Sequence, residues 1–236
     1  MKSLLLGSAA LALTASISLA DTVRLGTEGA YPPYNFINDA GEVDGFEREL
    51  GDELCKRAEL TCEWVTNDWD SIIPNLLSGN YDTIIAGMSI TDEREEVVDF
   101  TQGYTPPSPS AYAAMSADVD LEGGIVAAQT ATIQANHVVS TGATIVEYPT
   151  PDETVAAVNA GEADAVLADK DFLEPIVSST DLMFVGEDVL LGNGIGMAFR
   201  ESDDELRGKF DAAIATMKED GTLNTLIEKW EVGGTW

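Results

Sequence analysis

Hydrophobic residues recur along the chain with two alternating spacings, one typical of strands and one typical of helices. Residues 22–27 alternate apolar and polar positions, as a half-buried strand does. Residues 45–58 carry Phe46, Leu50 and Leu54 at a spacing of four, which predicts an amphipathic helix. Strands that alternate with helices predict βαβ units, parallel sheets and an α/β fold. Further strands are expected at 62–66, 81–88, 124–129, 144–149, 164–169 and 182–187, and helices at 68–80, 91–99, 132–142, 151–161, 172–179 and 203–230, the last one split at Asp220–Gly221.

Two segments interrupt this alternation and divide the chain. Residues 100–115 contain three prolines, and residues 190–199 are rich in glycine. The helices after the second break have no strands of their own, so we expect them to return to the first block. This predicts a discontinuous domain, residues 21–105 plus 195–236, and an inserted domain, residues 106–194, joined by two crossovers. Ligands in such sheets bind at the carboxyl ends of the strands, here across a cleft between the domains.

The beginning of the chain has the composition of an export signal. Lys2 precedes an apolar run that starts at Leu4, and the small residues Ser18 and Ala20 stand where a signal peptidase would cleave. The run is short for a membrane span. We interpret residues 1–20 as a signal peptide and expect the mature protein to be soluble outside the cytoplasm.

The charge balance changes the list of possible partners. The chain has 12 Lys and Arg against 42 Asp and Glu, a net charge of −30. Such a charge disfavours nucleic acid and anionic membrane surfaces as partners. Its carboxylates are expected to form a solvated surface, and we suspect a salty habitat in which ions screen their repulsion.

Cys55 and Cys62 are the two cysteines of the chain and lie seven residues apart. Export permits a disulfide between them, and two buried free thiols are the alternative. A metal site is not expected, because two cysteines without a nearby histidine are a poor ligand set.

One of the scarce cations stands in an unfavourable place. Arg94 lies in the first turn of the helix expected at 91–99, where the helix dipole favours negative charge. It is either a surface arginine paired with Asp92 or Glu95, or a group that binds an anion from outside the protein.

Several segments together resemble the periplasmic amino-acid-binding proteins of ABC importers, solute-binding protein family 3, and most closely the lysine/arginine/ornithine- and histidine-binding group. The resemblance implies a two-lobed, hinge-closing fold of type II and delivery of a solute to a membrane permease. It also implies a monomeric periplasmic protein without a cofactor, and the cysteine spacing matches that group. The segments that carry the resemblance are residues 26–36, 45–62, 68–95, 98–101, 161–169 and 219–230.

The resemblance also implies roles for single residues. Arg94 matches the arginine that binds the ligand's α-carboxylate, with Ser89 and Thr132 as further donors, and a guanidinium suits a planar carboxylate. Asp169 matches the acceptor for the α-ammonium, and the backbone carbonyl of Ala86 or Gly87 could share this task. The full set of implied ligand-binding residues is Glu28, Tyr31, Trp69, Ala86, Gly87, Met88, Ser89, Arg94, Ala131, Thr132 and Asp169.

Selection of the ligand side chain is expected to fall to three residues of the first domain. Tyr31 and Trp69 match aromatic or hydrophobic wall positions that would clamp an aliphatic or cationic side chain. Glu28 stands where basic-amino-acid binders place an aspartate near the distal charge. The chain departs from the group at Ala86, Gly87, Ala131 and Ile133, which replace polar residues. These losses favour arginine, lysine or ornithine over histidine.

Other functions remain open at this stage. A dehydratase-like enzyme could use Glu28 and Asp169 as acid and base, and a soluble sensor could feed a receptor. A serine hydrolase is not expected, because His137 lacks a nucleophile partner. Residues 192–196 lack the lysine of a phosphate loop. Opines and polar neutral amino acids also remain possible ligands.

Overall fold

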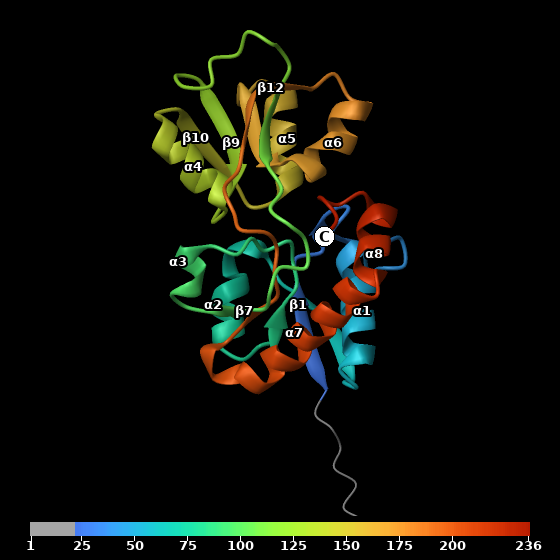
Figure 1. Ribbon diagram of the computed structural model, residues 1–236. Coiled ribbons are helices and arrows are strands. Elements are labelled where there is room, and N and C mark those ends of the chain that lie inside the picture. The colour runs from blue at the N-terminus through green and yellow to red at the C-terminus, as the bar shows by residue number, and fades with distance from the viewer. Residues whose placement is uncertain (1–21) are drawn as a thin grey trace, which may run out of the picture.

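Two five-stranded sheets, each covered by helices, form the body of the molecule (Figure 1). The computed structural model describes residues 22–236, so the signal peptide expected at 1–20 lies outside the described residues. The α/β class and the two-sheet architecture agree with the prediction. The first sheet has the order β5-β1-β6-β13-β7, from β1 (Val23–Thr27), β5 (Cys62–Thr66), β6 (Thr83–Ile84), β7 (Asp99–Phe100) and β13 (Ala198–Phe199).

The second sheet combines parallel and antiparallel strands. β9, β10 and β11 pair in parallel, as the alternation with helices predicted, whereas β8 runs antiparallel to β11 and β12. The expected parallel pairing therefore holds for part of each sheet, since β13 is also antiparallel to its neighbours. The order is β10-β9-β11-β8-β12, from β8 (Ser110–Ala114), β9 (Ile125–Gln129), β10 (Thr144–Tyr148), β11 (Ala165–Asp169) and β12 (Met183–Val189).

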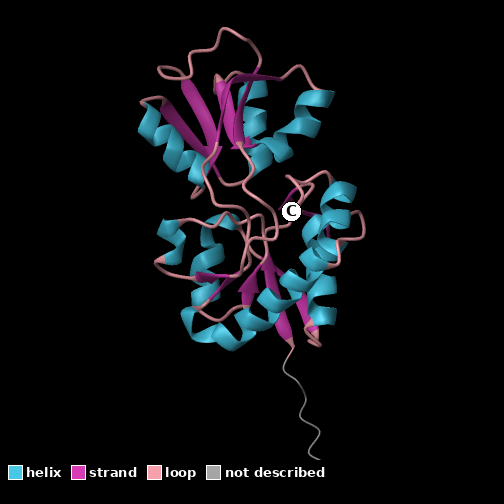
Figure 2. Ribbon diagram, in the orientation of Figure 1, coloured by secondary structure: helices cyan, strands magenta, loops and turns pink. Residues whose placement is uncertain are grey.

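Helices cover both sheets at the places that hydrophobic periodicity indicated (Figure 2). The segment 91–99 is an exception, because its helix α3 lasts for four residues before β7 begins. A small sheet, β2-β3-β4, was not predicted. Its strands are β2 (Ala30–Tyr31), β3 (Asn35–Ile37) and β4 (Val43–Asp44), and the helices are α1 (Phe46–Arg57), α2 (Ile72–Leu77), α3 (Asp92–Glu95), α4 (Ile133–Thr141), α5 (Pro151–Ala160), α6 (Lys170–Ser179), α7 (Asp204–Glu219) and α8 (Thr222–Trp230), with 3-10 turns at Trp69–Ser71 and Glu201–Asp203.

The chain crosses between the two sheets in two adjacent segments. The Tyr104 amide donates to the Ile195 carbonyl at 2.7 Å, and Thr105 forms an isolated bridge with Ile195. After the second crossover, α7 and α8 pack on α1, so the C-terminal helices return to the first sheet (Figure 1). We propose that the lobes divide at these crossovers, with residues 22–105 and 195–236 in the first lobe and 106–194 in the second.

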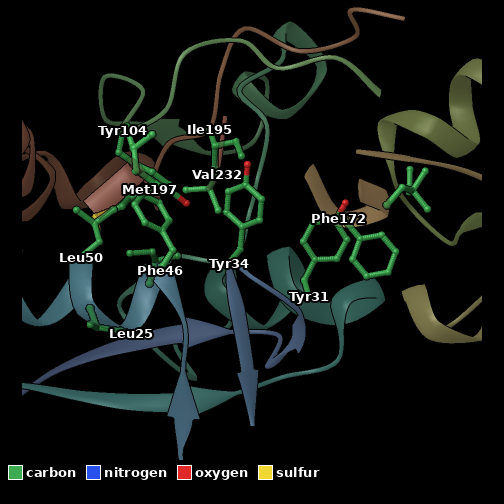
Figure 3. Packing of buried hydrophobic residues seen from close by; sticks show 14 of the residues in the cluster. Leu25, Tyr31, Tyr34, Phe46, Leu50, Tyr104, Phe172, Ile195, Met197 and Val232 are labelled. Atoms are coloured by element: carbon green, nitrogen blue, oxygen red, sulfur yellow. The ribbon is translucent and has the colours of Figure 1, made fainter. Parts of the chain in front are cut away.

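Buried aromatic rings carry the core across the lobe boundary (Figure 3). Tyr34, Phe46 and Tyr104 are at most 1% exposed and pack in the first lobe. The Tyr31 ring stacks on Phe172 of α6, with the centroids 4.8 Å apart and the planes 8° apart. This stacking joins the two lobes beside the cleft.

Cys55 and Cys62 form a disulfide, which tethers the last turn of α1 to the start of β5. The alternative of two free thiols is therefore wrong.

Candidate ligand-binding site

A pocket with an empty volume of about 320 Å³ lies between the lobes, at the carboxyl ends of four strands. Glu28 follows β1, Ala86 lies two residues after β6, Gln129 ends β9 and Asp169 ends β11. Loops at strand ends converge there because parallel strands point the same way. The lining residues are Glu28, Tyr31, Trp69, Ala86, Gly87, Ser89 and Arg94 from the first lobe, and Gln129, Thr132, Ile133, Gln134 and Asp169 from the second.

Arg94 faces the pocket without a partner of opposite charge. It takes part in none of the ion pairs between described residues, whereas Arg24, Arg48, Arg57, Arg200 and Arg207 each form at least one. Pairing with Asp92 or Glu95 is therefore wrong as an account of this side chain. Burial lowers the pKa of Arg94 to about 10.

Two contacts orient the Arg94 guanidinium. Its Nη1 donates to the Ser89 carbonyl at 2.9 Å, and the guanidinium carbon lies 5.4 Å from the centre of the Trp69 ring. The Thr91 hydroxyl caps α3 by accepting from the Arg94 amide. These contacts use one N–H of the fork and leave the others for an anion.

Asp169 brings a carboxylate to the pocket from the second lobe. Its Oδ2 accepts from the Tyr31 hydroxyl at 2.7 Å, and its Oδ1 accepts from Gln134 Nε2 at 2.7 Å and from the Ser110 hydroxyl at 3.4 Å. Burial raises the pKa of Asp169 to about 6. The nearby Arg94 opposes this rise, since a positive charge favours the carboxylate.

Glu28 places a second carboxylate in the pocket. Its Oε1 accepts from Gln129 Nε2 of the other lobe at 2.6 Å. Burial raises the pKa of Glu28 to about 7, and the carboxylates of Asp68, Glu47 and Asp152 add to the rise. A cation bound beside Glu28 would favour the ionised carboxylate and so lower this raised pKa.

Tyr31 and Trp69 both line the pocket, but each ring already has a neighbour. Tyr31 stacks on Phe172, and Trp69 lies beside the Arg94 guanidinium while its Nε1 donates to the Ala131 carbonyl at 3.3 Å. The Phe172 and Asp169 contacts of Tyr31 and the Ala131 contact of Trp69 reach the second lobe, so these aromatic residues also hold the lobes together.

Thr132 lies where the second lobe can donate to an anion. It is the N-cap of α4, and its hydroxyl accepts from the Ala135 amide at 3.1 Å and donates to the Gln129 carbonyl at 2.7 Å. Because the hydroxyl is engaged, the free N–H groups of the helix end are the stronger donors here.

Two expected residues do not line the pocket. The Met88 side chain is fully buried in the first-lobe core with Trp69 and Val98. It does not reach the pocket, although the adjacent residues Gly87 and Ser89 line it. Ala131 is exposed, with φ of +59°, and contributes its carbonyl to Trp69.

Gln129 and Gln134 are pocket residues that sequence reasoning missed, and Ile133 was noted only as a departure from the group. Gln129 could have been found, because it ends a predicted strand, where ligand-binding residues gather. Gln134 has no such signal, since its role depends on which face of α4 meets the cleft.

The profile of the bacterial extracellular solute-binding proteins, family 3, matches residues 23–233. The chain belongs to this family. Among family members with curated names, the L-arginine-binding protein of Pseudomonas aeruginosa is 35% identical, over 96% of this chain and 95% of the relative. The lysine/arginine/ornithine-binding periplasmic protein of Escherichia coli is 31% identical, over 90% of this chain and 88% of the relative.

Solved structures of the family agree with the fold. A periplasmic His/Glu/Gln/Arg/opine family-binding protein from Silicibacter pomeroyi, in complex with lysine, is 73% identical with a TM-score of 0.89, over 91% of this chain and all of that chain. An ancestral amino-acid-binding protein, a precursor of cyclohexadienyl dehydratase, is 29% identical with a TM-score of 0.80, over 89% of this chain and 95% of that chain.

Two kinds of feature are absent from residues 22–236. No helix there has the length and apolar character to span a bilayer. No group of three or more His, Cys, Asp or Glu side chains there is arranged to hold a metal ion.

Proposed function

We propose that this chain is the solute-binding component of an ABC importer and holds a basic L-amino acid between its lobes. The observation that carries the proposal is that one pocket holds both an arginine without an ion partner, Arg94, and a half-buried carboxylate, Asp169. These are the complements of an α-carboxylate and an α-ammonium. Because the two groups come from different lobes, a zwitterion would bind the closed form best and so drive closure.

The α-carboxylate is assigned to the free N–H groups of Arg94, the Ser89 hydroxyl and the N-terminus of α4 at Thr132. The α-ammonium is assigned to Asp169, with the carbonyl of Ala86 or Gly87 as a second acceptor. The other implied site residues, Ala131 and Met88, act through their backbone in this assignment.

Glu28 is assigned to the cation of the ligand side chain. It lines the pocket with Gln129, Tyr31 and Trp69 around it. A basic ligand is further supported by relatives named for arginine or for lysine, arginine and ornithine, and by the 73% identical protein in complex with lysine. We therefore propose lysine, arginine or ornithine as the ligand class.

The place of action is proposed from the family. Several relatives are named as periplasmic proteins, and residues 1–20 have the composition of a signal peptide. We propose a monomer in the periplasm that docks on the membrane subunits of an ABC permease. A role as a soluble sensor for a receptor would use the same closed form.

One observation favours an enzyme as the second candidate. Glu28 and Asp169 have pKa values of about 7 and 6, in the range that suits a general acid or base. One similar structure is named as a precursor of a dehydratase. The curated relatives are named as binding proteins, which favours binding without chemistry.

Calorimetric titration of the protein, stripped of bound solute, with a panel of amino acids tests the proposal. We expect lysine, arginine or ornithine to bind best and to be recovered unchanged by NMR after incubation. Arg94→Ala should weaken binding by about 100-fold or more, the loss typical when one partner of a buried charge pair is removed. Arg48→Ala, on the exposed side of α1, is the matched control.

Three outcomes would contradict parts of this proposal. Binding of no amino acid by the wild type would remove the transport function. A preference for glutamine or glutamate over arginine and lysine would show that the assignment of Glu28 is wrong. Conversion of the added amino acid to a product would favour the enzyme.

A further inference from the structure

A buried carboxylate lies beneath the pocket without touching its interior. Glu47, in the first turn of α1, has no exposed surface and does not line the cavity. It enters none of the ion pairs found in residues 22–236. Burying a charge without a counter-ion is costly, so hydrogen bonds must stabilise the Glu47 carboxylate instead.

Three hydrogen-bond donors converge on this carboxylate. The Gly87 amide donates to Oε1 at 2.6 Å, the Tyr104 hydroxyl donates to the same oxygen, and Asn35 Nδ2 donates to Oε2 at 2.7 Å. Asn35 and Tyr104 are themselves fully buried. Charge-assisted hydrogen bonds of this kind replace the missing cation.

Each donor belongs to a part of the molecule that the site depends on. Gly87 forms the floor of the pocket, and its φ of +62° suits glycine. Asn35 also accepts from the Gly29 amide through Oδ1 at 2.7 Å, and Gly29 directly follows Glu28. Tyr104 lies on the first crossover. The Glu47 carboxylate therefore links the pocket floor at Gly87, the loop that carries Glu28, and the first crossover.

The charge of Glu47 fixes the direction of these hydrogen bonds. Asn35 must turn its NH2 toward the carboxylate and its carbonyl toward the Gly29 amide. If the amide group turned around, its carbonyl would face the carboxylate and its NH2 would face another N–H. Asn35 therefore has one favourable orientation, and Glu47 imposes it.

We propose that Glu47 is a positioning residue for the ligand site: through Gly87 it holds the pocket floor, and through Asn35 it holds the loop that carries Glu28. This inference rests on the proposed function, since it assigns Glu28 to the ligand's distal cation. Selectivity for that cation then depends on a carboxylate that never contacts the ligand.

Glu47→Gln is the first test. Gln Oε1 can keep its contacts with Gly87 and Tyr104, but its NH2 would face the NH2 of Asn35. Asn35 must then turn, which leaves the Gly29 amide facing an N–H group. We expect the affinity for lysine to fall about tenfold, the effect of one buried unsatisfied donor. The affinity for 6-hydroxynorleucine, an uncharged isostere, should fall much less, so the lysine preference declines.

A rescue variant separates positioning from general stability. In Glu47→Gln/Asn35→Asp the carboxylate moves to residue 35, where it accepts from the Gln NH2 and from the Gly29 amide. We expect this variant to recover the lysine preference to within about threefold of the wild type, because every donor again meets an acceptor. Asn35→Asp alone sets two carboxylates against each other and should lower the unfolding temperature.

The decisive measurement is the ratio of the affinities for lysine and 6-hydroxynorleucine, taken with the unfolding temperature of each variant. A purely structural role for Glu47 would weaken both ligands equally and leave the ratio unchanged. Glu63→Gln, an exposed glutamate on β5, is the matched control and should change neither quantity. Asn35→Ala removes the donor to Glu47 Oε2 together with the acceptor of the Gly29 amide, and it should lower the same ratio even if Glu47→Gln does not fold.

A wild-type ratio in Glu47→Gln or Asn35→Ala, or a double variant that fails to recover the ratio, would overturn the inference while the proposed function stands. A wild-type protein that binds lysine without preference over 6-hydroxynorleucine would instead overturn the assignment of Glu28, and this inference with it.

Discussion

At the residue scale, three ionisable side chains of the pocket are held where burial disfavours their charge. Burial lowers the pKa of Arg94 to about 10 and raises the pKa of Asp169 to about 6 and that of Glu28 to about 7. An α-carboxylate, an α-ammonium and a side-chain cation would offer each of them the opposite charge. A basic amino acid therefore relieves an electrostatic cost that the empty pocket carries.

A pH dependence follows from the two raised carboxylate pKa values. Both lie above their ordinary values of 4.5 and 3.8, so the folded empty protein holds these protons more tightly than the unfolded chain. Their contribution to stability is full below about pH 4 and is lost as the pH rises through 6 and 7. A cationic ligand binds the ionised forms, so its affinity should rise over the same range.

Two measurements check this dependence. Unfolding temperatures with and without lysine, from pH 4.5 to 8, should diverge as the pH rises. Calorimetry near pH 6.5 in two buffers of different ionisation enthalpy should detect proton release on binding. Glu28→Gln should reduce the release, and an affinity that is constant or falls between pH 5 and 8 would contradict the assignment.

Single residues differ in how far the sequence could reveal them. Arg94 stands out because a cation at a helix start, in a chain poor in cations, needs a reason. Glu47 gave no signal, since a glutamate in the first turn of a helix is ordinary and only the fold brings Gly87 and Asn35 to it. Gln134 is hidden for the same reason.

At the element scale, the Cys55–Cys62 disulfide fastens α1 to β5 on the side of the first lobe away from the pocket. The bond closes a short loop, and the chain-entropy formula gives about 2.5 kcal/mol of stabilisation. Cys55→Ser/Cys62→Ser should lower the free energy of unfolding by that order, as measured in urea. The affinity for lysine should not change, and a loss of affinity in the folded variant would contradict the separation of the disulfide from the site.

Elements with a clear period were predicted, and those set by pairing were not. α1 and α5 carry their hydrophobic pattern in the sequence, and α5 also has the Thr150–Glu153 capping box. β8 was taken as part of a connection, because its small residues follow three prolines. β7 is a two-residue strand defined by its pairing with β13, and the helix expected at 91–99 extended into it.

At the scale of the whole molecule, the net charge of −30 implies repulsion among the surface carboxylates, which salt should screen. The Debye length falls from about 30 Å at 0.01 M to about 3 Å at 1 M ionic strength. We expect the unfolding temperature of the ligand-free protein to rise between these concentrations of sodium chloride. An unfolding temperature independent of salt would show that the surface carboxylates are too far apart to interact, and would remove the salty-habitat hypothesis.

Closure of the two lobes gives the last prediction, and it concerns a contact between Tyr34 and Asp171 that lies outside the pocket. The Tyr34 hydroxyl of the first lobe donates to Asp171 Oδ2 of the second at 3.0 Å, and the Ser108 hydroxyl on the crossover donates to the same oxygen at 3.0 Å. Neither Tyr34 nor Asp171 lines the ligand pocket. This contact can therefore stabilise the closed form without contacting the ligand.

Tyr34→Phe removes the hydroxyl and keeps the buried ring. Loss of a hydrogen bond to a carboxylate should shift the lobes toward the open form by about 1 kcal/mol, which weakens every ligand about fivefold. Calorimetry should find this factor for both lysine and 6-hydroxynorleucine, and X-ray scattering should find a larger radius of gyration at partial saturation. Tyr148→Phe, which removes a hydroxyl that contacts Glu162 within the second lobe, is the control. A change in the ratio of the two affinities would mean that Tyr34 shapes the pocket itself, whereas unchanged affinities would mean that the contact does not hold the lobes closed.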